Sequence, residues 1–384
     1  MAKSPRSSAL VFDPIPFKGG SKIATAVALG TCKVDAKRFV IATVDPTFWR
    51  NSDFYRTHDV QVVRLWIPGS LLKQHNGARY WLCQLWFMLS LAMVCLTTRQ
   101  LKQVVGASGP GLDMPLYLLK PCFRFEVIQF IHGNVGLSRS IGYCLTRADS
   151  VHYLPSTKAS LNQALSCYLQ SAVGQQEVNA LSECYLGGER YVEFVNGLQE
   201  SHWPSACQHK TPVCFWAASL LKWKGLDLFV QALKTAHQRT RFATHICYLI
   251  PTSTTLPVSR APVLLKHTEW HHDPDNLDTL RRESNIFVST SVNEPFGLSI
   301  LEALAAGMCV ILPQDGSYWD QVLTDGEHCI KYPAGDTDAL THAIEQAVTK
   351  KALFSTCCEG AQRIAKRYTA TQCYQAFANA LSAA

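Results

Sequence analysis

The chain contains no Cys-x-x-Cys pair, no low-complexity tract and no short-period repeat among its 384 residues. It therefore lacks the usual spacing of a cysteine-ligated metal site, and its composition is that of a globular protein. Charged residues make up only 17%, and the formal net charge is +7. Such a charge suits an anionic partner, such as a nucleotide diphosphate or an acidic membrane face, but is too small to indicate nucleic-acid binding.

An apolar core of the kind found in secretory signals is also missing from the N-terminal sequence MAKSPRSSALVFDP. The chain has 15 cysteines, an odd number, and disulfide frameworks belong mainly to small secreted domains. We therefore expect a protein of the reducing cytoplasm, in which most cysteines serve as small buried hydrophobic residues.

One long apolar run is present, WLCQLWFMLSLAMVCL at residues 81–96, interrupted only by Gln84 and Ser90. It is shorter than the roughly 20 residues that a membrane-spanning helix needs. We therefore expect a buried core helix. Contact with a membrane surface is the main alternative, because aromatic residues flank the run, and a membrane span is the third.

Strands and helices alternate along the N-terminal half, which predicts a parallel sheet with helices on both faces. Apolar segments bounded by glycine, proline or aspartate predict strands at residues 9–13, 38–44, 102–107, 125–131 and 149–154. Helices are predicted at residues 22–29 and 137–147, in addition to the apolar run.

The alternation restarts after residues 196–212, a polar stretch with two prolines that we interpret as a linker. The predicted strands that follow are 213–218, 244–250, 285–291 and 309–312. The predicted helices are 226–236, 275–283, 297–306, 338–350 and much of 354–381. Two doubly wound domains in series would bind a ligand at the carboxyl ends of their strands, in the cleft between the domains.

Residues 285–314, NIFVSTSVNEPFGLSILEALAAGMCVILPQ, are the most informative segment. A buried strand is followed by a short loop that contains Glu294, and a helix begins near Phe296 or Gly297. A helix N-terminus leaves backbone N–H groups without partners and carries a partial positive charge, so it can hold an anion.

Glu302 lies eight residues after Glu294, on a predicted helix whose other residues are apolar or small. A buried carboxylate is costly unless it is hydrogen-bonded, which favours a ligand with hydroxyl donors. An internal basic partner or a solvent channel would explain the same carboxylate, so both interpretations remain open at this point.

This segment resembles the E-x7-E motif of retaining glycosyltransferases of the GT-B fold, and most closely family four, the group 1 bacterial sugar transferases. The resemblance rests on Glu294, Pro295, Phe296, Gly297, Leu298, Glu302, Ala303, Ala306 and Gly307. In the C-terminal half it extends to Lys224-Gly225, Asp315-Gly316, Asp320-Gln321-Val322, Asp325-Gly326 and Pro333-Ala334-Gly335-Asp336. In the N-terminal half only four landmarks match, namely Gly19-Gly20, His132-Gly133, Ala148-Asp149 and Asn196-Gly197.

The fold that this resemblance implies is α/β, with two doubly wound Rossmann-like domains that face each other across a cleft. The acceptor-side domain would comprise residues 1–195 and, after the linker 196–212, the donor-binding domain residues 213–365. The C-terminal helix, residues 366–384, would pack back on the N-terminal domain.

The resemblance also implies a role for each matching residue. Glu294 would contact the hydroxyls of the donor sugar, and Glu302 the two ribose hydroxyls. Backbone amides around Phe296, Gly297 and Leu298 would hold the diphosphate, which Lys224 would neutralise. Gly19 and Gly20 would let the first loop approach the donor, and His132 would contact the sugar or line the reaction centre. The implied catalytic residues are Glu294, His132 and Lys224.

Simpler interpretations exist for three of these positions. His132 and the Gly19-Gly20 pair would also suit turns, and Lys224 an exposed helix start. The family usually has an arginine five residues before the lysine, where this chain has Ser219. Lys222 is the candidate replacement at the donor site.

No metal site is expected. Residues 269–275, EWHHDPD, contain two adjacent histidines, but neighbouring side chains point in different directions on most backbones. We predict a surface loop there, and the family that the chain resembles uses no metal.

The implied activity is metal-independent, retaining transfer of a hexosyl-type sugar in cell-envelope polysaccharide synthesis. The donor would be a nucleoside-diphosphate sugar, which is a substrate rather than a cofactor, and the acceptor a saccharide or lipid-linked glycan. No nucleic-acid partner is expected. We expect a cytoplasmic enzyme and leave open a peripheral contact with the inner membrane face. The alternatives are a non-catalytic nucleotide-sugar-binding subunit, which Ser219 favours, and a sugar-nucleotide epimerase on the same fold.

Overall fold

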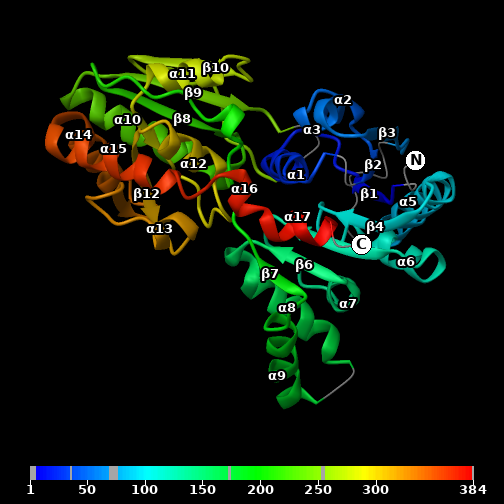
Figure 1. The fold of residues 1–384 in the computed structure, drawn as a ribbon. Helices are drawn as coiled ribbons and strands as arrows, with labels where there is room; N and C mark the ends of the chain where they lie inside the picture. Colours follow the sequence, from blue (N-terminus) through cyan, green and yellow to red (C-terminus); the bar gives the residue numbers. More distant parts are fainter. Residues whose placement is uncertain (1–5, 35–36, 69–76, 172–173, 252–255, 383–384) are drawn as a thin grey trace. The chain divides into compact units, whose positions relative to one another are not determined.

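The computed structural model describes residues 6–34, 37–68, 77–171, 174–251 and 256–382. These residues form two compact units, drawn in Figure 1. Unit 1 comprises Met1–Gly197 and Ala370–Ala384, and unit 2 comprises Leu198–Thr369. Each unit is an α/β fold built on one parallel sheet, as the alternation of strands and helices predicts.

Unit 1 has a seven-stranded sheet with the order β3-β2-β1-β4-β5-β6-β7, in which all neighbours are parallel. The strands are β1 (Ser8–Asp13), β2 (Arg38–Thr43), β3 (Val60–Arg64), β4 (Leu101–Gly106), β5 (Glu126–Ile131), β6 (Ser150–Tyr153) and β7 (Tyr191–Glu193). All six residues of the central strand β1 are buried, as is typical of a parallel sheet covered on both faces.

The helices of unit 1 follow its strands in sequence. They are α1 (Gly20–Gly30), α2 (Pro46–Arg50), α3 (Asp53–Thr57), α5 (Gly77–Thr97), α6 (Met114–Phe123), α7 (Arg139–Arg147), α8 (Lys158–Leu169), α9 (Gln175–Leu186), α16 (Ala370–Cys373) and α17 (Gln375–Ser382). Helices α16 and α17 come from the C-terminal segment. Phe377 of α17 stacks on Phe130 of β5 at a centroid distance of 4.3 Å, and Gln103 Nε2 of β4 donates to the Ala380 carbonyl at 2.9 Å.

Unit 2 has a six-stranded parallel sheet with the order β10-β9-β8-β11-β12-β13. The strands are β8 (Val213–Ser219), β9 (Ala243–Leu249), β10 (Thr268–His272), β11 (Ile286–Val288), β12 (Cys309–Gln314) and β13 (Ile330–Pro333). The helices are α10 (Leu226–Arg239), α11 (Leu277–Glu283), α12 (Leu298–Ala305), α13 (Tyr318–Val322), α14 (Thr337–Thr349) and α15 (Lys351–Ala365).

The division of the chain differs from the predicted one at the linker. Residues 198–212 belong to unit 2, because their backbone is bonded to it: Cys207 N–H donates to the Ala306 carbonyl, and Gln208 N–H to the Arg282 carbonyl, both at 2.9 Å. Unit 2 also extends to Thr369, so the segment that returns to unit 1 begins at Ala370 rather than at residue 366. Residues 383 and 384 of the predicted C-terminal helix lie outside the described residues.

The apolar run belongs to α5, a helix of 21 residues, and the expected burial is wrong for one of its faces. Phe87 and Leu91 are buried in the core of unit 1, whereas Leu89 and Met93 are exposed by 58% and 63%. Within the described part of the chain, α5 is the one helix long and apolar enough to cross a membrane, and only a third of its most apolar window is buried.

Most cysteines are buried, as expected for cysteines that serve as small hydrophobic residues. All fifteen are free in the structure, and ten of them are buried. Burial raises the pKa of the thiols of Cys32 and Cys247 to about 12, so both remain protonated and unreactive at neutral pH.

Candidate functional site

In unit 2, the strand order reverses between β8 and β11, which connect to β9 and β12 on opposite sides. Such a topological switch point is where open α/β sheets bind ligands, at the carboxyl ends of the strands. The chain leaves β8 towards a short 3₁₀ helix, Lys222–Lys224, and leaves β11 towards Glu294 and the start of α12. The fold therefore brings Lys224 and Glu294 to the same edge of the sheet.

The Lys224-Gly225 pair has a clear steric basis. Gly225 has a φ of 73°, and a Cβ atom there would lie 2.2 Å from the Thr290 carbonyl oxygen. Thr290 Oγ1 in turn donates to the Lys224 carbonyl at 2.8 Å and accepts from Trp216 Nε1 at 3.0 Å. Only glycine allows this close approach. The backbone of Lys224 is thereby held against the residues that directly follow β11.

The Lys224 ammonium forms an ion pair with the Glu294 carboxylate. The two side chains are only 18% and 14% exposed, and the ammonium lies 4.1 Å from the centroid of the Trp223 ring. Two residues that the family resemblance assigns to the donor site are thus in contact. An incoming diphosphate would compete with Glu294 for this ammonium.

Helix α12 begins at Leu298, and its N-cap Gly297 has a φ of 81°, in the left-handed region that favours glycine. Phe296 is 2% exposed and packs against Trp319 at a centroid distance of 5.2 Å. Its side chain therefore anchors the loop in the core, while the backbone N–H groups in the first turn of α12 can donate hydrogen bonds to an anion.

Glu302 is held by an internal basic partner, one of the two arrangements that its sequence position allowed. Arg281 Nη2 of α11 donates to Glu302 Oε2 at 2.5 Å, and Arg281 Nη1 donates to Asp278 Oδ1 at 2.9 Å. The Arg281 side chain is 6% exposed, whereas that of Glu302 is 31% exposed. The carboxylate is thus oriented by a buried arginine and remains accessible to a ligand.

Lys222 is already engaged with another residue. Its ammonium lies 2.7 Å from Asp227 Oδ2, and the two side chains are 53% and 47% exposed. Ser259 Oγ donates to the same carboxylate at 3.0 Å. Ser219, which stands where the family usually has arginine, is the last residue of β8. The geometry therefore gives little support to Lys222 as a replacement for the arginine.

In unit 1 the strand order reverses between β1 and β4, and the loop after β1 leads to Gly19 and Gly20. Gly19 has a φ of −147°, a conformation open to any residue, and a Cβ there would approach no atom closer than 3.7 Å. Gly20 is the first residue of α1. A strained turn therefore does not require glycine at position 19, and a Cβ there would make only an ordinary van der Waals contact with the Phe17 ring.

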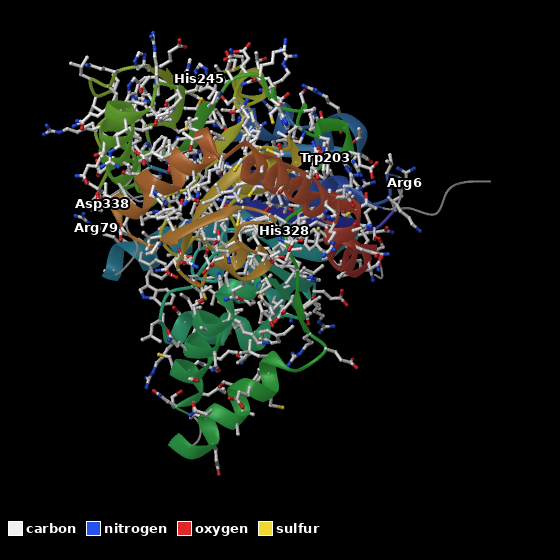
Figure 2. The ribbon with its side chains drawn as sticks, turned by 90° about the vertical axis from the view of Figure 1, so that its left-hand side faces the viewer. Arg6, Arg79, Trp203, His245, His328 and Asp338 are labelled. Carbon is white, nitrogen blue, oxygen red and sulfur yellow. The ribbon has the colours of Figure 1, made fainter. Side chains whose placement is uncertain are left out.

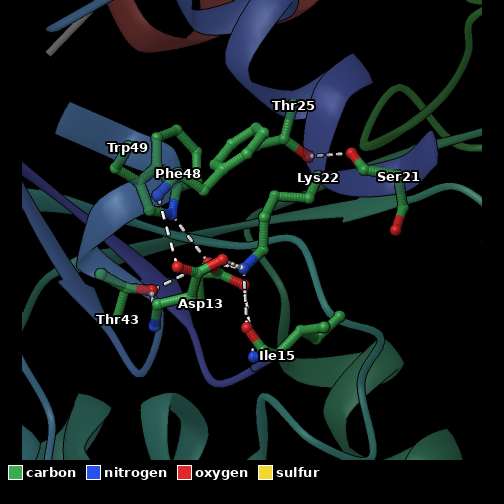
Figure 3. Close-up of polar contacts among 9 residues, drawn as sticks. Asp13, Ile15, Ser21, Lys22, Thr25, Thr43, Phe48 and Trp49 are labelled. Carbon is green, nitrogen blue, oxygen red and sulfur yellow. Dashed lines mark hydrogen bonds and ion pairs between the residues drawn. The ribbon is translucent and has the colours of Figure 1, made fainter. Parts of the chain in front are cut away.

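A buried ion pair fixes this loop at its base, as Figure 3 shows. Lys22 Nζ lies 3.0 Å from Asp13 Oδ2, with side-chain exposures of 1% and 6%, and donates to the Ile15 carbonyl at 2.6 Å. Asp13 Oδ2 also accepts from Trp49 Nε1 at 2.7 Å and from Thr43 Oγ1 at 2.9 Å. Sequence reasoning missed this network, because a lysine in a predicted helix is usually exposed.

His132 follows β5 and lies next to helix α1. Its Nε2 is 3.0 Å from Thr25 Oγ1 of α1, and its ring packs edge-on against Phe130 at 4.3 Å. Burial lowers the pKa of His132 to about 3. The imidazole is therefore neutral at physiological pH. It can donate or accept a hydrogen bond but cannot act as a cation.

The prediction of a surface loop at residues 269–275 is wrong for its first half, because Thr268–His272 is the edge strand β10. Alternation along β10 places Glu269 and His271 on one face, and the parallel register sets Glu269 opposite His245 of β9. His245 Nδ1 is 3.1 Å from His271 Nε2, and Glu269 Oε2 lies 3.6 Å and 3.9 Å from them. Among the described residues this is the one His/Cys/Asp/Glu group compact enough for a metal ion, and it contains no predicted donor-site residue. His245 is labelled in Figure 2.

Known proteins resemble the chain in sequence over most of unit 2 and in structure over nearly its whole length. Residues 199–367 match the family model of glycosyl transferases group 1. That segment contains all the predicted donor-site residues of unit 2, including Lys224, Glu294 and Glu302. No curated protein sequence matches the chain.

Solved structures match over nearly the whole chain at low identity. HepE of Anabaena in complex with UDP-glucose has a TM-score of 0.69 at 14% identity, covering 98% of this chain and 100% of that one. Sucrose-phosphate synthase of Thermosynechococcus elongatus has a TM-score of 0.71 at 15% identity, covering 99% and 100%. WaaG, a glycosyltransferase of lipopolysaccharide biosynthesis, has a TM-score of 0.63 at 13% identity, covering 97% and 99%.

At these identities the structural matches establish the fold, and the family model covers unit 2. The family model agrees with the family that the E-x7-E motif resembles. The chain therefore has the GT-B fold of two Rossmann-like domains, and its residues 199–367 are similar to the group 1 glycosyltransferases.

Proposed function

We propose that the chain transfers a hexosyl-type sugar from a nucleoside-diphosphate sugar to a saccharide or lipid-linked glycan, with retention of configuration and without a metal ion. The observation that carries the proposal is the contact between Lys224 and Glu294 beside the start of α12. It joins a cation, a carboxylate and a helix N-terminus at the ligand-binding edge of a doubly wound sheet. The nucleotide-sugar donor is supported by HepE of Anabaena, whose structure contains UDP-glucose.

In this proposal the bond between the anomeric carbon and the diphosphate oxygen breaks first and gives an oxocarbenium-like state. The acceptor hydroxyl then attacks from the face that the diphosphate is leaving, and the diphosphate takes its proton. Lys224 and the amides of the first turn of α12 stabilise the negative charge that develops on the diphosphate. Glu294 binds sugar hydroxyls, and Glu302, held by Arg281, binds the ribose hydroxyls. His132 stays neutral and donates or accepts a hydrogen bond.

We further propose that the enzyme acts in the cytoplasm, in the synthesis of a cell-envelope polysaccharide. The acceptor side would be unit 1, where a side chain at Gly19 would meet only the Phe17 ring, at 3.7 Å. The resemblance of the chain to group 1 sugar transferases is the basis for this assignment.

Donor turnover by the purified full-length protein tests the proposal. Nucleoside-diphosphate sugars are incubated with the protein without acceptor, and the products are separated by ion-exchange chromatography. Slow release of nucleoside diphosphate supports a transferase. A changed but still nucleotide-linked sugar would point to an epimerase, and donor binding without any turnover to the non-catalytic subunit that Ser219 favours.

A further inference from the structure

Helix α5 has two apolar faces, and unit 1 covers only one of them. At 100° per residue, six large apolar side chains fall within an arc of about 100° on the other face. Their exposed fractions run from 37% to 71%, and they are Leu82, Leu85, Trp86, Leu89, Met93 and Leu96. We call these six residues the α5 arc. A surface helix of a soluble domain normally has polar residues there.

The opposite face of α5 is part of the core of unit 1. Leu91 is fully buried, and Phe87 packs edge-on against Phe12 of the central strand β1, with ring centroids 5.4 Å apart. A membrane-spanning orientation would pull these side chains out of the core. The α5 arc can therefore meet a bilayer only with the helix lying along the surface.

Tryptophans border the α5 arc. Trp66 is 64% exposed, its ring centroid is 5.5 Å from that of Trp86, and its carbonyl accepts from Trp86 Nε1 at 2.8 Å. Trp81 is 52% exposed in the first turns of the helix. Tryptophan is enriched where an apolar surface meets the polar headgroups of a bilayer.

The segment of the chain that contains the arc carries charges of a single sign. Residues 60–112 contain no aspartate or glutamate but five basic residues. Of these, the four described by the structure are all exposed: Arg64, Arg79, Arg99 and Lys102. Arg79 lies near the start of α5 and is labelled in Figure 2, and Arg99 follows its end. The next acidic residue, Asp113, is fully buried, and burial raises its pKa to about 8.

This charge pattern argues against a second copy of the chain as the occupant. A symmetric contact between two α5 arcs would bring the same basic residues of both copies together, where they repel one another. Anionic lipid headgroups would instead attract them, while long basic side chains reach the headgroups from the edge of the apolar face.

We propose that the α5 arc docks unit 1 on the surface of a bilayer that contains anionic lipids, with α5 lying in the interface and its tryptophans at the headgroup level. Basic residues at both ends of the helix contact the headgroups. The proposal goes beyond the proposed transferase activity, and its test uses neither donor nor acceptor.

Vesicle co-sedimentation of the purified full-length protein tests the docking. Wild-type protein is expected to bind vesicles of phosphatidylcholine mixed with phosphatidylglycerol at least about tenfold more tightly than phosphatidylcholine alone, at low salt. The double variant Leu89→Gln/Met93→Gln is expected to bind the mixed vesicles at least about tenfold more weakly, because two side chains no longer enter the apolar layer. Arg79→Gln/Lys102→Gln is expected to lose most of the preference for the anionic vesicles.

The matched control is Leu256→Gln/Leu264→Gln in unit 2, where the side chains are 56% and 99% exposed, and it is expected to bind vesicles like wild type. Circular dichroism and the melting temperature of each variant verify folding. The proposal is overturned if wild-type protein stays in the supernatant with mixed vesicles, or if Leu89→Gln/Met93→Gln binds as tightly as wild type. It is also overturned if light scattering finds a wild-type dimer that this variant converts to a monomer.

Discussion

Lys224 and Glu294, 70 positions apart in the sequence, form an ion pair whose two side chains are largely buried. The family resemblance assigns them to different parts of the donor, the lysine to the diphosphate and the glutamate to the sugar. Their pairing suggests how the site could respond to a ligand. A diphosphate would take over the ammonium and leave the carboxylate to the sugar hydroxyls.

Replacement of Lys224 by alanine is expected to lower kcat/KM by about 10²-fold, the usual effect of removing one preorganised electrostatic group. Negative charge grows on the diphosphate in the transition state, so kcat should fall as well as affinity. Lys222→Ala is the control, and we expect only a small effect, since the Lys222 ammonium is already paired with Asp227. Steady-state kinetics of the two variants and the wild type measure these effects. Near-normal turnover of Lys224→Ala would mean that the phosphate site lies elsewhere.

The two glutamates should be separable by experiment. Glu302→Gln is expected to weaken binding of the free nucleoside diphosphate by about tenfold, because a charged acceptor for the ribose hydroxyls is lost. Glu294→Gln should leave that affinity nearly unchanged and mainly lower kcat. Calorimetry with the nucleotide, together with turnover rates, provides the comparison, and the opposite pattern would mean that the two roles are exchanged.

Activity is expected to survive a strong chelator. The proposed phosphate site consists of a lysine and a helix N-terminus, and the compact group of His245, Glu269 and His271 contains none of its residues. His245→Asn should therefore leave turnover unchanged with or without chelator. Loss of activity on chelation that manganese or magnesium restores would contradict the proposed metal-independent transfer.

Asp113 should make folding stability depend on pH. Burial raises its pKa to about 8, whereas in the unfolded chain it ionises near its ordinary pKa of about 4. Between these values the folded state holds one more proton, so the free energy of unfolding from this group falls as pH rises. The free energy of unfolding of the Asp113→Asn variant should lack this decrease, which amounts to up to about 4 kcal/mol between pH 5 and pH 8.

Urea unfolding at the two pH values measures this difference. The exposed Asp59→Asn variant is the control and should keep the wild-type dependence. An unchanged slope in Asp113→Asn would mean that the carboxyl is ionised in the folded protein at neutral pH.

The parts of the fold that sequence predicted are those with local causes. The strand before Glu294 and the start of α12 depend on an apolar run, a glycine with positive φ and helical periodicity, all within a few residues. Edge strand β10 was missed because His271 and His272 lack an apolar pattern, and the strand exists through its pairing with β9. Such long-range pairing leaves no local trace.

In the candidate site, too, features with local causes could be predicted from the sequence and long-range contacts could not. The spacing of Glu294 and Glu302 is visible in sequence, but the partners Lys224 and Arg281 come from other elements and meet the glutamates only in the fold. Arg281 lies in the last turn of α11, where a basic residue is ordinary, so nothing marked it as buried. Exposure of one face of α5 was equally hidden, because a helix that is apolar all round has no preferred side.

The return of the C-terminal segment to unit 1 affects the order in which the chain can fold during synthesis. On the ribosome, the continuous unit 2 emerges in full before α17, which covers Phe130 and binds Gln103. We expect unit 1, although translated first, to reach its final packing after unit 2. Its strands β4 and β5 are completely covered only when residues 375–382 have been synthesised. A released chain truncated after Thr369 should therefore be more sensitive to protease in unit 1 than in unit 2.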